Sequence, residues 1–525
     1  LKLKCGCVHH DNGLLGAASY DRAEERKVEL LKASGFNAIR CAHNPPAPAM
    51  LDACDRLGML VIDETFDCWR TGKNPGDYHL HFEDWWQRDT ASMVLRDRNH
   101  PCILAWSIGN EVQERAGLSD GAAWARRQAE YIRSLDPTRA ITSALPFLFE
   151  EAFVERKRKP DPATAGSTQS SFDLDRHKPT DVAHDEWGNR TREFCRALDI
   201  VGYNYIHTRY AWDGEHFPGR VIAGTETYPS FAYDSWQETE RLPFVIGDFV
   251  WTALDYLGES GLGKVIVDSP VPYAAIDPWP LHLAICGDID ICGFKRPQSH
   301  FRDRLWGLAT APYIGVLDPQ MYGKRIEFSP WGWEPVTDSW SFPGREGMPT
   351  RVDVYSVDEQ VELFVNGVSV GLRPAGAAQR NKATFDVTYQ PGVVEAVGYR
   401  DGRAVSRASL ATVGAAAALR LSADRTAIHA AYGDLAYVTV EIVDAQGRLV
   451  PYAEHQVSLA LTGAGELAAA GSANPMSEEV YVGACHRAWQ GRLLAVVRST
   501  GQSGEIALQA SADGLASAQL ELKAL

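Results

Sequence analysis

The chain has 525 residues, which at about 100–200 residues per domain predicts about three domains. Hydrophobic residues make up 45% and charged residues 23% of the sequence, so we expect packed cores rather than a disordered chain. The net charge is −16 without a long basic run, which disfavours a nucleic-acid partner, and no apolar stretch approaches the about 18 residues needed to span a membrane.

The first part of the chain alternates strand and helix patterns. A strand is expected over residues 3–10, followed by a helix that a capping box of Asp21 and Glu24 begins and Gly35 ends. The pattern continues with strands at 36–40, 59–63, 102–108, 139–145, 198–204, 220–225 and 243–251, and with helices at 48–57, 82–95 and 122–135. These eight units predict a (β/α)8 TIM barrel over residues 1–312. The first strand is not followed by Gly-x-Gly-x-x-Gly, which argues against a dinucleotide-binding fold.

Two segments depart from this alternation. The polar stretch 150–192 predicts a long surface loop after the fifth strand. After about residue 340 the pattern changes to period two, and Asn366-Gly367 between two valine-rich runs predicts a hairpin. We expect a β-sandwich accessory domain over 313–413, an Ala-rich linker at 414–418, and an immunoglobulin-like β-sandwich domain over 414–525.

The spacing of the cysteines shows no metal-binding motif. None of the ten cysteines form a Cys-x-x-Cys pair and most lie in apolar runs, so buried free thiols are expected rather than a structural zinc site. A few disulfides stay open, and cysteine usage does not settle the compartment. A periplasmic or secreted location is favoured over a cytoplasmic one.

Two carboxylates follow strands of the expected barrel. Barrel enzymes place their reacting groups at the carboxyl ends of the strands, where Glu111 follows the fourth strand and Glu226 the seventh. Glycoside hydrolysis needs one carboxylic acid to protonate the leaving oxygen and one carboxylate to attack or to activate water. Trp106, Tyr205 and Trp251 fit this chemistry because aromatic faces stack on sugar rings. The alternative is that each glutamate is a solvated rim residue.

Three segments resemble glycoside hydrolase family 2, the family of β-galactosidases, β-glucuronidases and β-mannosidases. They are 36–64, 93–111 with R-D-R-N-H-P followed by W-S-I-G-N-E, and 243–259. The resemblance covers the whole expected barrel and implies a retaining exo-β-glycosidase. Family members normally carry a sugar-binding sandwich and an immunoglobulin-like domain before the barrel. We expect these to be absent, cleaved or outside this sequence, because the first strand starts at residue 3.

The resemblance assigns roles to individual residues. It implies that Glu111 is the general acid/base and Glu226 the nucleophile. Asn110 would bond the sugar 2-hydroxyl and Tyr205 would bond the nucleophile. Arg40 would keep Glu226 ionised by a nearby positive charge.

Further residues are expected to line the sugar pocket. The resemblance matches His10 and His43 with pocket histidines and Trp251 with a platform tryptophan. Glu64, Asp67 and Trp69 are further candidates, with loop capping as the alternative for Asp67 and core packing as the alternative for Trp69. Asp248, Asp255 and Glu259 are rival nucleophiles because they lie in or after the eighth strand.

The stretch 286–297 narrows the choice of substrate sugar. It lacks the Asn-x-Lys element by which family β-glucuronidases grip a carboxylate, and Asp288 and Asp290 would repel an anion. Residues 9–18 look most like bacterial β-galactosidases, so terminal β-D-galactosides are the expected substrate. A β-glucuronidase, β-galacturonidase or β-mannosidase is the alternative within the family, and a carbohydrate-binding pseudoenzyme is the alternative of another class. No cofactor is expected to be required, Mg²⁺ stays possible, and a homo-oligomer is possible.

Overall fold

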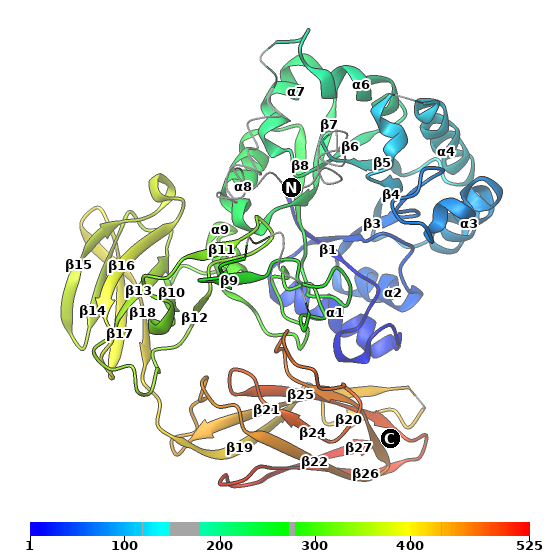
Figure 1. The fold of residues 1–525 in the computed structure, drawn as a ribbon. Coiled ribbons are helices and arrows are strands. Elements are labelled where there is room, and N and C mark those ends of the chain that lie inside the picture. Colours follow the sequence, from blue (N-terminus) through cyan, green and yellow to red (C-terminus); the bar gives the residue numbers. More distant parts are fainter. Residues whose placement is uncertain (118, 148–178, 180, 272, 274–278, 432) are drawn as a thin grey trace.

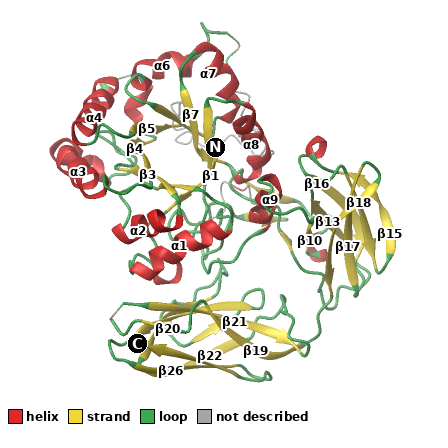
Figure 2. Cartoon of the chain, turned by 180° about the vertical axis from the view of Figure 1, so that it is seen from behind, coloured by secondary structure: helices red, strands yellow, loops and turns green. Residues whose placement is uncertain are grey.

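The computed structural model describes residues 1–525 except 118, 148–178, 180, 272, 274–278 and 432. A barrel ringed by helices carries one β-sandwich at its side and a second at its base in the view of Figure 1. Seen from behind, the helices gather around the barrel strands (Figure 2).

Eight parallel strands close the barrel, because β1 pairs with β2 on one side and with β8 on the other. The strands are β1 (Leu3–Val8), β2 (Ala38–Cys41), β3 (Leu60–Glu64), β4 (Ile103–Asn110), β5 (Ala140–Leu145), β6 (Ile200–Asn204), β7 (Val221–Thr227) and β8 (Val245–Val250). The helices are α1 (Asp21–Ala33), α2 (Pro48–Leu57), α3 (Phe82–Asp97), α4 (Gly121–Leu135), α6 (Glu186–Cys195), α7 (Tyr210–His216), α8 (Ala232–Arg241) and α9 (Pro297–Leu305). The predicted TIM barrel is confirmed.

Two local predictions are wrong. The residue that caps α1 is Tyr20, without a side-chain hydrogen bond, and the Glu24 carboxylate accepts hydrogen bonds from Asn12 and Ser19 instead of closing a capping box. The predicted loop 150–192 lies mostly outside the described residues. Its described end from Glu186 onward is helical, because it forms α6.

The first sandwich pairs two four-stranded antiparallel sheets, in the orders β12-β10-β13-β16 and β15-β14-β17-β18. The strands are β10 (Tyr313–Leu317), β12 (Val336–Thr337), β13 (Pro349–Tyr355), β14 (Gln360–Val365), β15 (Val368–Pro374), β16 (Lys382–Thr388), β17 (Val393–Arg400) and β18 (Arg403–Ala411). Asn366 and Gly367 join β14 to β15 with φ of 50° and 78°, which confirms the predicted two-residue hairpin.

The last sandwich pairs a four-stranded sheet, β19-β21-β25-β23, with a five-stranded sheet, β20-β27-β26-β22-β24. The strands are β19 (Ala416–Ala423), β20 (Ala427–Ile428), β21 (Leu435–Asp444), β22 (Gln456–Gly463), β23 (Gly465–Gly471), β24 (Cys485–Arg487), β25 (Arg492–Ser499), β26 (Gly504–Ser511) and β27 (Ala518–Ala524). The predicted linker 414–418 is wrong for residues 416–418, since β19 starts at Ala416.

The last sandwich packs against the loops that follow β1 and β8. Leu14 and Ile291 from these loops share one buried apolar cluster with Leu435, Tyr437 and Leu494 of the sandwich. These loops continue from the carboxyl ends of two barrel strands, so the sandwich supports the end of the barrel where barrel enzymes place their active sites.

All ten cysteines are free thiols and nine of them are buried, as predicted. Within the described ranges, the helices are too short or too polar to span a bilayer.

Removing apolar volume from the contact between barrel and sandwich should destabilise the protein. Leu494 in β25 is 2% exposed, so Leu494→Ala leaves a cavity and should lower the free energy of unfolding by about 2–5 kcal/mol. The control is Leu372→Ala, at a leucine that is 48% exposed, which should change stability by less than about 0.5 kcal/mol. Thermal and denaturant unfolding of the full chain measure both, and equal effects would contradict the assigned contact.

Candidate active site

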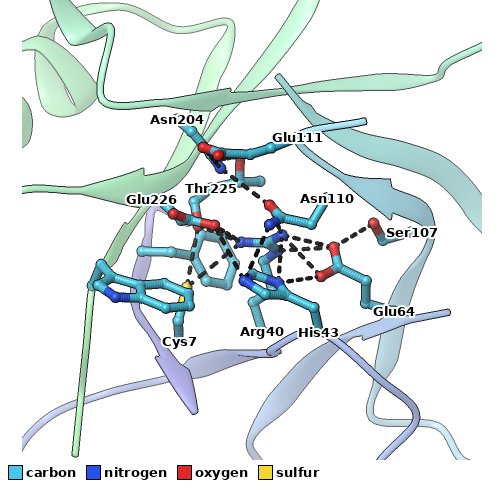
Figure 3. Close-up of polar contacts among 12 residues, drawn as sticks. Cys7, Arg40, His43, Glu64, Ser107, Asn110, Glu111, Asn204, Thr225 and Glu226 are labelled. Carbon is cyan, nitrogen blue, oxygen red and sulfur yellow. Dashed lines mark hydrogen bonds and ion pairs between the residues drawn. The ribbon is translucent and has the colours of Figure 1, made fainter. Parts of the chain in front are cut away.

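The two predicted catalytic carboxylates come from two barrel strands that are not neighbours, β4 and β7, and Figure 3 shows both in one group of polar side chains. Glu111 directly follows β4, and Glu226 lies near the end of β7. Asn204, the last residue of β6, donates from its amide nitrogen to Glu111 Oε1 at 3.0 Å, and its amide oxygen accepts from the Thr225 hydroxyl at 2.7 Å. The Thr225 bond fixes the orientation of the Asn204 amide, which therefore holds Glu111 in place. Asn204 was not among the residues predicted for the site.

Arg40 occupies the centre of the site and is fully buried. Its guanidinium donates to Glu226 Oε1 at 2.7 Å, to both carboxylate oxygens of Glu64 at 2.8 and 2.9 Å, and to Asn110 Oδ1 at 2.9 Å. Ser107 donates a further hydrogen bond to Glu64 at 2.6 Å. One cation thus fixes side chains from β3, β4 and β7.

The charges around Glu226 act in opposite directions on its pKa. Burial and the negative charge of Glu111 raise the pKa of Glu226, while Arg40 and His43 oppose this rise. Burial also acts to raise the pKa of Glu64, but Arg40 and His43 outweigh it and lower that pKa. Arg40 contacts Glu226 directly, so within the pair of catalytic carboxylates it favours ionised Glu226.

His43 and Trp251 come together as the sequence analysis expected. The two rings stack at 5.1 Å with an angle of 9° between their planes. His43 Nδ1 lies 2.7 Å from Glu64 Oε1, and its Nε2 lies 3.1 Å from the Asn110 amide nitrogen. A carboxylate only accepts and an amide nitrogen only donates, so His43 protonated at Nδ1 satisfies both contacts.

The Asn110 amide is fully engaged by protein groups. Its oxygen accepts from Arg40 and, at 3.2 Å, from Asn204, while its nitrogen donates to Asp67 Oδ1 at 2.9 Å as well as to His43. A sugar 2-hydroxyl that bonds this amide must therefore replace or share one of these contacts.

His9 and not His10 joins the other pocket residues. His10 is exposed and, in the described part of the chain, makes no hydrogen bond to another predicted site residue. His9 stacks on Tyr256 at 3.8 Å and stands edge-on to Trp251 at 5.4 Å and to His43 at 6.2 Å. Burial lowers the pKa of His9 well below its usual range, and nearby His43 lowers it further.

Tyr205 lies at the end of β6 with a left-handed φ of 62°, and its backbone N–H donates to the Glu226 carbonyl at 2.7 Å. Its hydroxyl accepts from the indole N–H of Trp331 at 3.1 Å. The expected bond from this hydroxyl to the Glu226 carboxylate is not formed among the described residues. Burial raises the pKa of Tyr205 well above its usual value, and the charges of Glu226 and Glu111 add to this, so the hydroxyl keeps its proton.

Of the two remaining candidate residues, one lies in the pocket and the other in the hydrophobic core. Asp67 Oδ1 accepts from Lys73 Nζ at 2.5 Å as well as from Asn110, and its side chain is 43% exposed. Burial raises the pKa of Asp67, but His43 and Lys73 outweigh it and lower that pKa. Trp69 is fully buried and donates to the Ile108 carbonyl, which supports its core-packing alternative.

The three rival nucleophiles are bound elsewhere. Asp248 is buried with its carboxylate 3.9 Å from Arg302, and Asp255 forms an ion pair with Arg296 at 2.5 Å. Glu259 accepts a hydrogen bond from Tyr256. In the described structure none of the three bonds to Arg40 or Glu111.

A group of possible metal ligands lies far from this site. Asp55, His100 and Cys102 bring one ligand atom each within 4.8 Å of one another. Cys102 directly precedes β4, whereas Glu111 directly follows it, so the group lies at the opposite end of the barrel.

Comparisons with known proteins agree with this architecture. Residues 6–145 match the TIM barrel domain of glycosyl hydrolases family 2, and residues 419–521 match the C-terminal domain 5 of glycoside hydrolase family 2. Residues 347–406 match a domain of unknown function. The first half of the barrel and the last sandwich of this chain therefore match domains of glycoside hydrolase family 2.

Individual relatives cover the whole chain. A β-galactosidase of Bacteroides ovatus, BoGH2A, is 31% identical over 100% of this chain and 61% of its own length. A putative β-glucuronidase of Formosa agariphila is 30% identical over 87% of this chain and 42% of its own length. The crystal structure of a family 2 member from Bacteroides cellulosilyticus has a TM-score of 0.86 and 40% identity over 100% of this chain and 62% of that chain. The chain thus spans about three fifths or less of these relatives.

Replacing Arg40 by lysine should shift the pH dependence of hydrolysis. Lysine keeps a charge but cannot present the planar fork that bonds Glu226, Glu64 and Asn110 together. Arg40 lowers the pKa of Glu226, so its loss raises that pKa, and a higher pH is then needed to ionise Glu226. The acidic limb of kcat/KM should move to higher pH, with kcat/KM reduced about tenfold or more.

The control for this change is Arg302→Lys. Arg302 is also fully buried and paired with a carboxylate, Asp288, at 2.8 Å, but it lies outside the Arg40 cluster. A pH profile that moves equally in both variants, or in neither, would contradict the role of Arg40.

Proposed function

We propose that this chain is the catalytic part of a retaining exo-β-glycosidase. The observation that carries the proposal is one pocket in which Glu226 receives a hydrogen bond from buried Arg40 while Glu111 receives one from Asn204. The two glutamates thus have different environments: a cation contacts Glu226, and a neutral amide contacts Glu111. Different environments are what allow one carboxylate to stay ionised while the other carries a proton.

The proposed reaction is a double displacement. Ionised Glu226 attacks the anomeric carbon while protonated Glu111 donates its proton to the departing oxygen, and ionised Glu111 then takes a proton from the water that releases the sugar. The mechanism requires the two carboxyl groups to lie about 5–5.5 Å apart. These steps need no metal ion, and a structural or stimulating role for Mg²⁺ stays open.

We propose terminal β-D-galactosides as substrates. The support is the similarity to the Bacteroides ovatus β-galactosidase, together with residues 9–18. The expected repulsion of an anion by Asp288 and Asp290 does not support the choice, because both carboxylates serve the loop itself. Asp288 pairs with Arg302 at 2.8 Å, and Asp290 accepts backbone hydrogen bonds from Cys292 and Phe294.

A β-glucuronide is the second candidate. It is favoured by the similarity to the Formosa agariphila protein, and one cation, Lys73, lies beside the partly exposed Asp67. Lys73 is neutralised by Asp67, so it offers a sugar carboxylate less attraction than a free cation would.

A panel of nitrophenyl glycosides distinguishes these sugars. The β-D-galactoside should be hydrolysed with the highest kcat/KM, ahead of the β-D-glucuronide, β-D-galacturonide and β-D-mannoside, and the α-galactoside should not react. A kcat/KM for the β-glucuronide above that for the β-galactoside would contradict the proposed sugar. A chain that binds sugars but hydrolyses none of the panel would point to the pseudoenzyme alternative.

Replacing each of the two glutamates by alanine should impair a different step of the reaction. Glu226→Ala cannot form a glycosyl-enzyme, so azide should restore turnover as the α-glycosyl azide. Glu111→Ala can still form the intermediate from an activated aryl glycoside, and azide should then give the β-glycosyl azide because its attack needs no general base. Product stereochemistry is measured by NMR.

Glu259→Ala removes a rival carboxylate and is the control. It should keep its activity and give no azide product. If Glu226→Ala gave the β-azide and Glu111→Ala the α-azide, the two roles would be reversed.

A further inference from the structure

A segment beyond the barrel is anchored to two of the loops above the barrel strands. Its strand β11 (Ile326–Phe328) pairs antiparallel with β9 (Val265–Val267), which lies in the chain after β8, and Figure 1 shows the two strands side by side. The carbonyl of Pro330 accepts hydrogen bonds from both the backbone N–H and the hydroxyl of Ser230, at 3.2 and 2.7 Å, and Ser230 belongs to the loop after β7. The backbone just before residue 331 is therefore held by loops of the barrel.

The residue that follows Trp331 has no room for a side chain. A Cβ on Gly332 would lie 2.8 Å from Phe328 Cβ and 3.1 Å from the Gly263 carbonyl oxygen, so only glycine allows this close approach. Trp331, between the anchored Pro330 and the tightly packed Gly332, is placed by the fold and not by a flexible loop.

The Trp331 side chain packs against two tyrosines that lie beside the predicted catalytic carboxylates. Its ring stands edge-on to Tyr205 at 5.4 Å and to Tyr228 at 4.9 Å, and the two tyrosines stack on each other at 4.3 Å. Its indole N–H donates to the Tyr205 hydroxyl oxygen at 3.1 Å. The backbone N–H of Tyr205 donates to the Glu226 carbonyl at 2.7 Å and Tyr228 directly follows β7, so both tyrosines border Glu226.

A phenol has one hydrogen to donate. Because Trp331 donates to the Tyr205 oxygen, the Tyr205 hydrogen points away from the indole and is left for another acceptor, although no bond to Glu226 is formed in the described structure. A hydroxyl oxygen that accepts a hydrogen bond also becomes a stronger donor.

We propose that Trp331 is a positioning residue for catalysis: it fixes the Tyr205 oxygen so that the hydroxyl hydrogen can turn to the Glu226 carboxylate during the reaction, and the segment after the barrel thereby completes the active site. This proposal rests on the proposed glycosidase function. The donor from Tyr205 stabilises the carboxylate of Glu226 when it leaves the anomeric carbon, because the negative charge returns to it in that step.

The test exchanges tryptophan for phenylalanine at two places in the same segment. Trp331→Phe keeps an aromatic ring and removes the N–H. The matched control is Trp333→Phe, because Trp333 also donates to a tyrosine hydroxyl, that of Tyr355 at 2.9 Å, outside the pocket cluster. Trp331→Phe should lower kcat about 3–10-fold with little change in KM, the effect of one hydrogen bond. Trp333→Phe should leave kcat within about twofold of the wild type.

Two further readouts separate positioning from a loss of structure. The acidic limb of kcat against pH should move to higher pH in Trp331→Phe only, because in the substrate complex a weaker donor from Tyr205 leaves the pKa of Glu226 higher. In a Tyr205→Phe background, Trp331→Phe should cause no further loss, since the hydroxyl through which it acts is gone.

The possible results distinguish a failure of the role of Trp331 from a failure of the proposed function. Equal kcat in Trp331→Phe and Trp333→Phe, an unmoved acidic limb, or the full loss in the Tyr205→Phe background would overturn the role of Trp331 while leaving the proposed function intact. A wild-type chain that hydrolyses no glycoside would contradict the proposed function and the role of Trp331 with it.

Discussion

A single buried cation determines the arrangement of the pocket. Arg40 is removed from water, and a guanidinium there is tolerated only if its donors are paired. The fold supplies Glu64 from β3, Asn110 from β4 and Glu226 from β7, so three strand ends must close on one group. The barrel therefore holds Glu226, the proposed nucleophile, in a fixed position before a substrate arrives, which is the condition for preorganised catalysis.

The same cluster sets the charge of the pocket. One cation faces Glu64 and Glu226, so the buried cluster carries a net negative charge when both are ionised, and Glu111 adds a further acidic group. A transition state of glycoside hydrolysis gains positive charge on the sugar ring. An anionic pocket favours that charge, while the same anionic character is the reason that burial and Glu111 raise the pKa of Glu226. Stabilising the transition state and keeping the nucleophile ionised thus make opposite demands, and Arg40 balances them.

The strand ends were predictable from sequence because period and turn residues fix where a strand stops, and Glu111 and Glu226 each stand at such a stop. Sequence alone could not predict which of two adjacent residues faces the pocket. His9 and His10 differ only in the direction that the chain takes after β1. Trp331 could not be found either, because pattern alone does not show that β11 returns to pair with β9. The charge of Asp288 was misjudged for the same reason, as its partner Arg302 lies on the following helix.

The ion pair at the mouth of the pocket bears on the choice of sugar. Lys73 only donates and Asp67 only accepts when both are ionised, and they meet at Asp67 Oδ1. A sugar hydroxyl can accept from one and donate to the other at the same time, so a neutral sugar suits both partners. A sugar carboxylate could accept from Lys73 only and would meet the negative charge of Asp67, which is partly exposed and whose pKa is lowered. The pair therefore favours a neutral glycone on its own physical grounds, independently of the stretch after β8 that the sequence suggested.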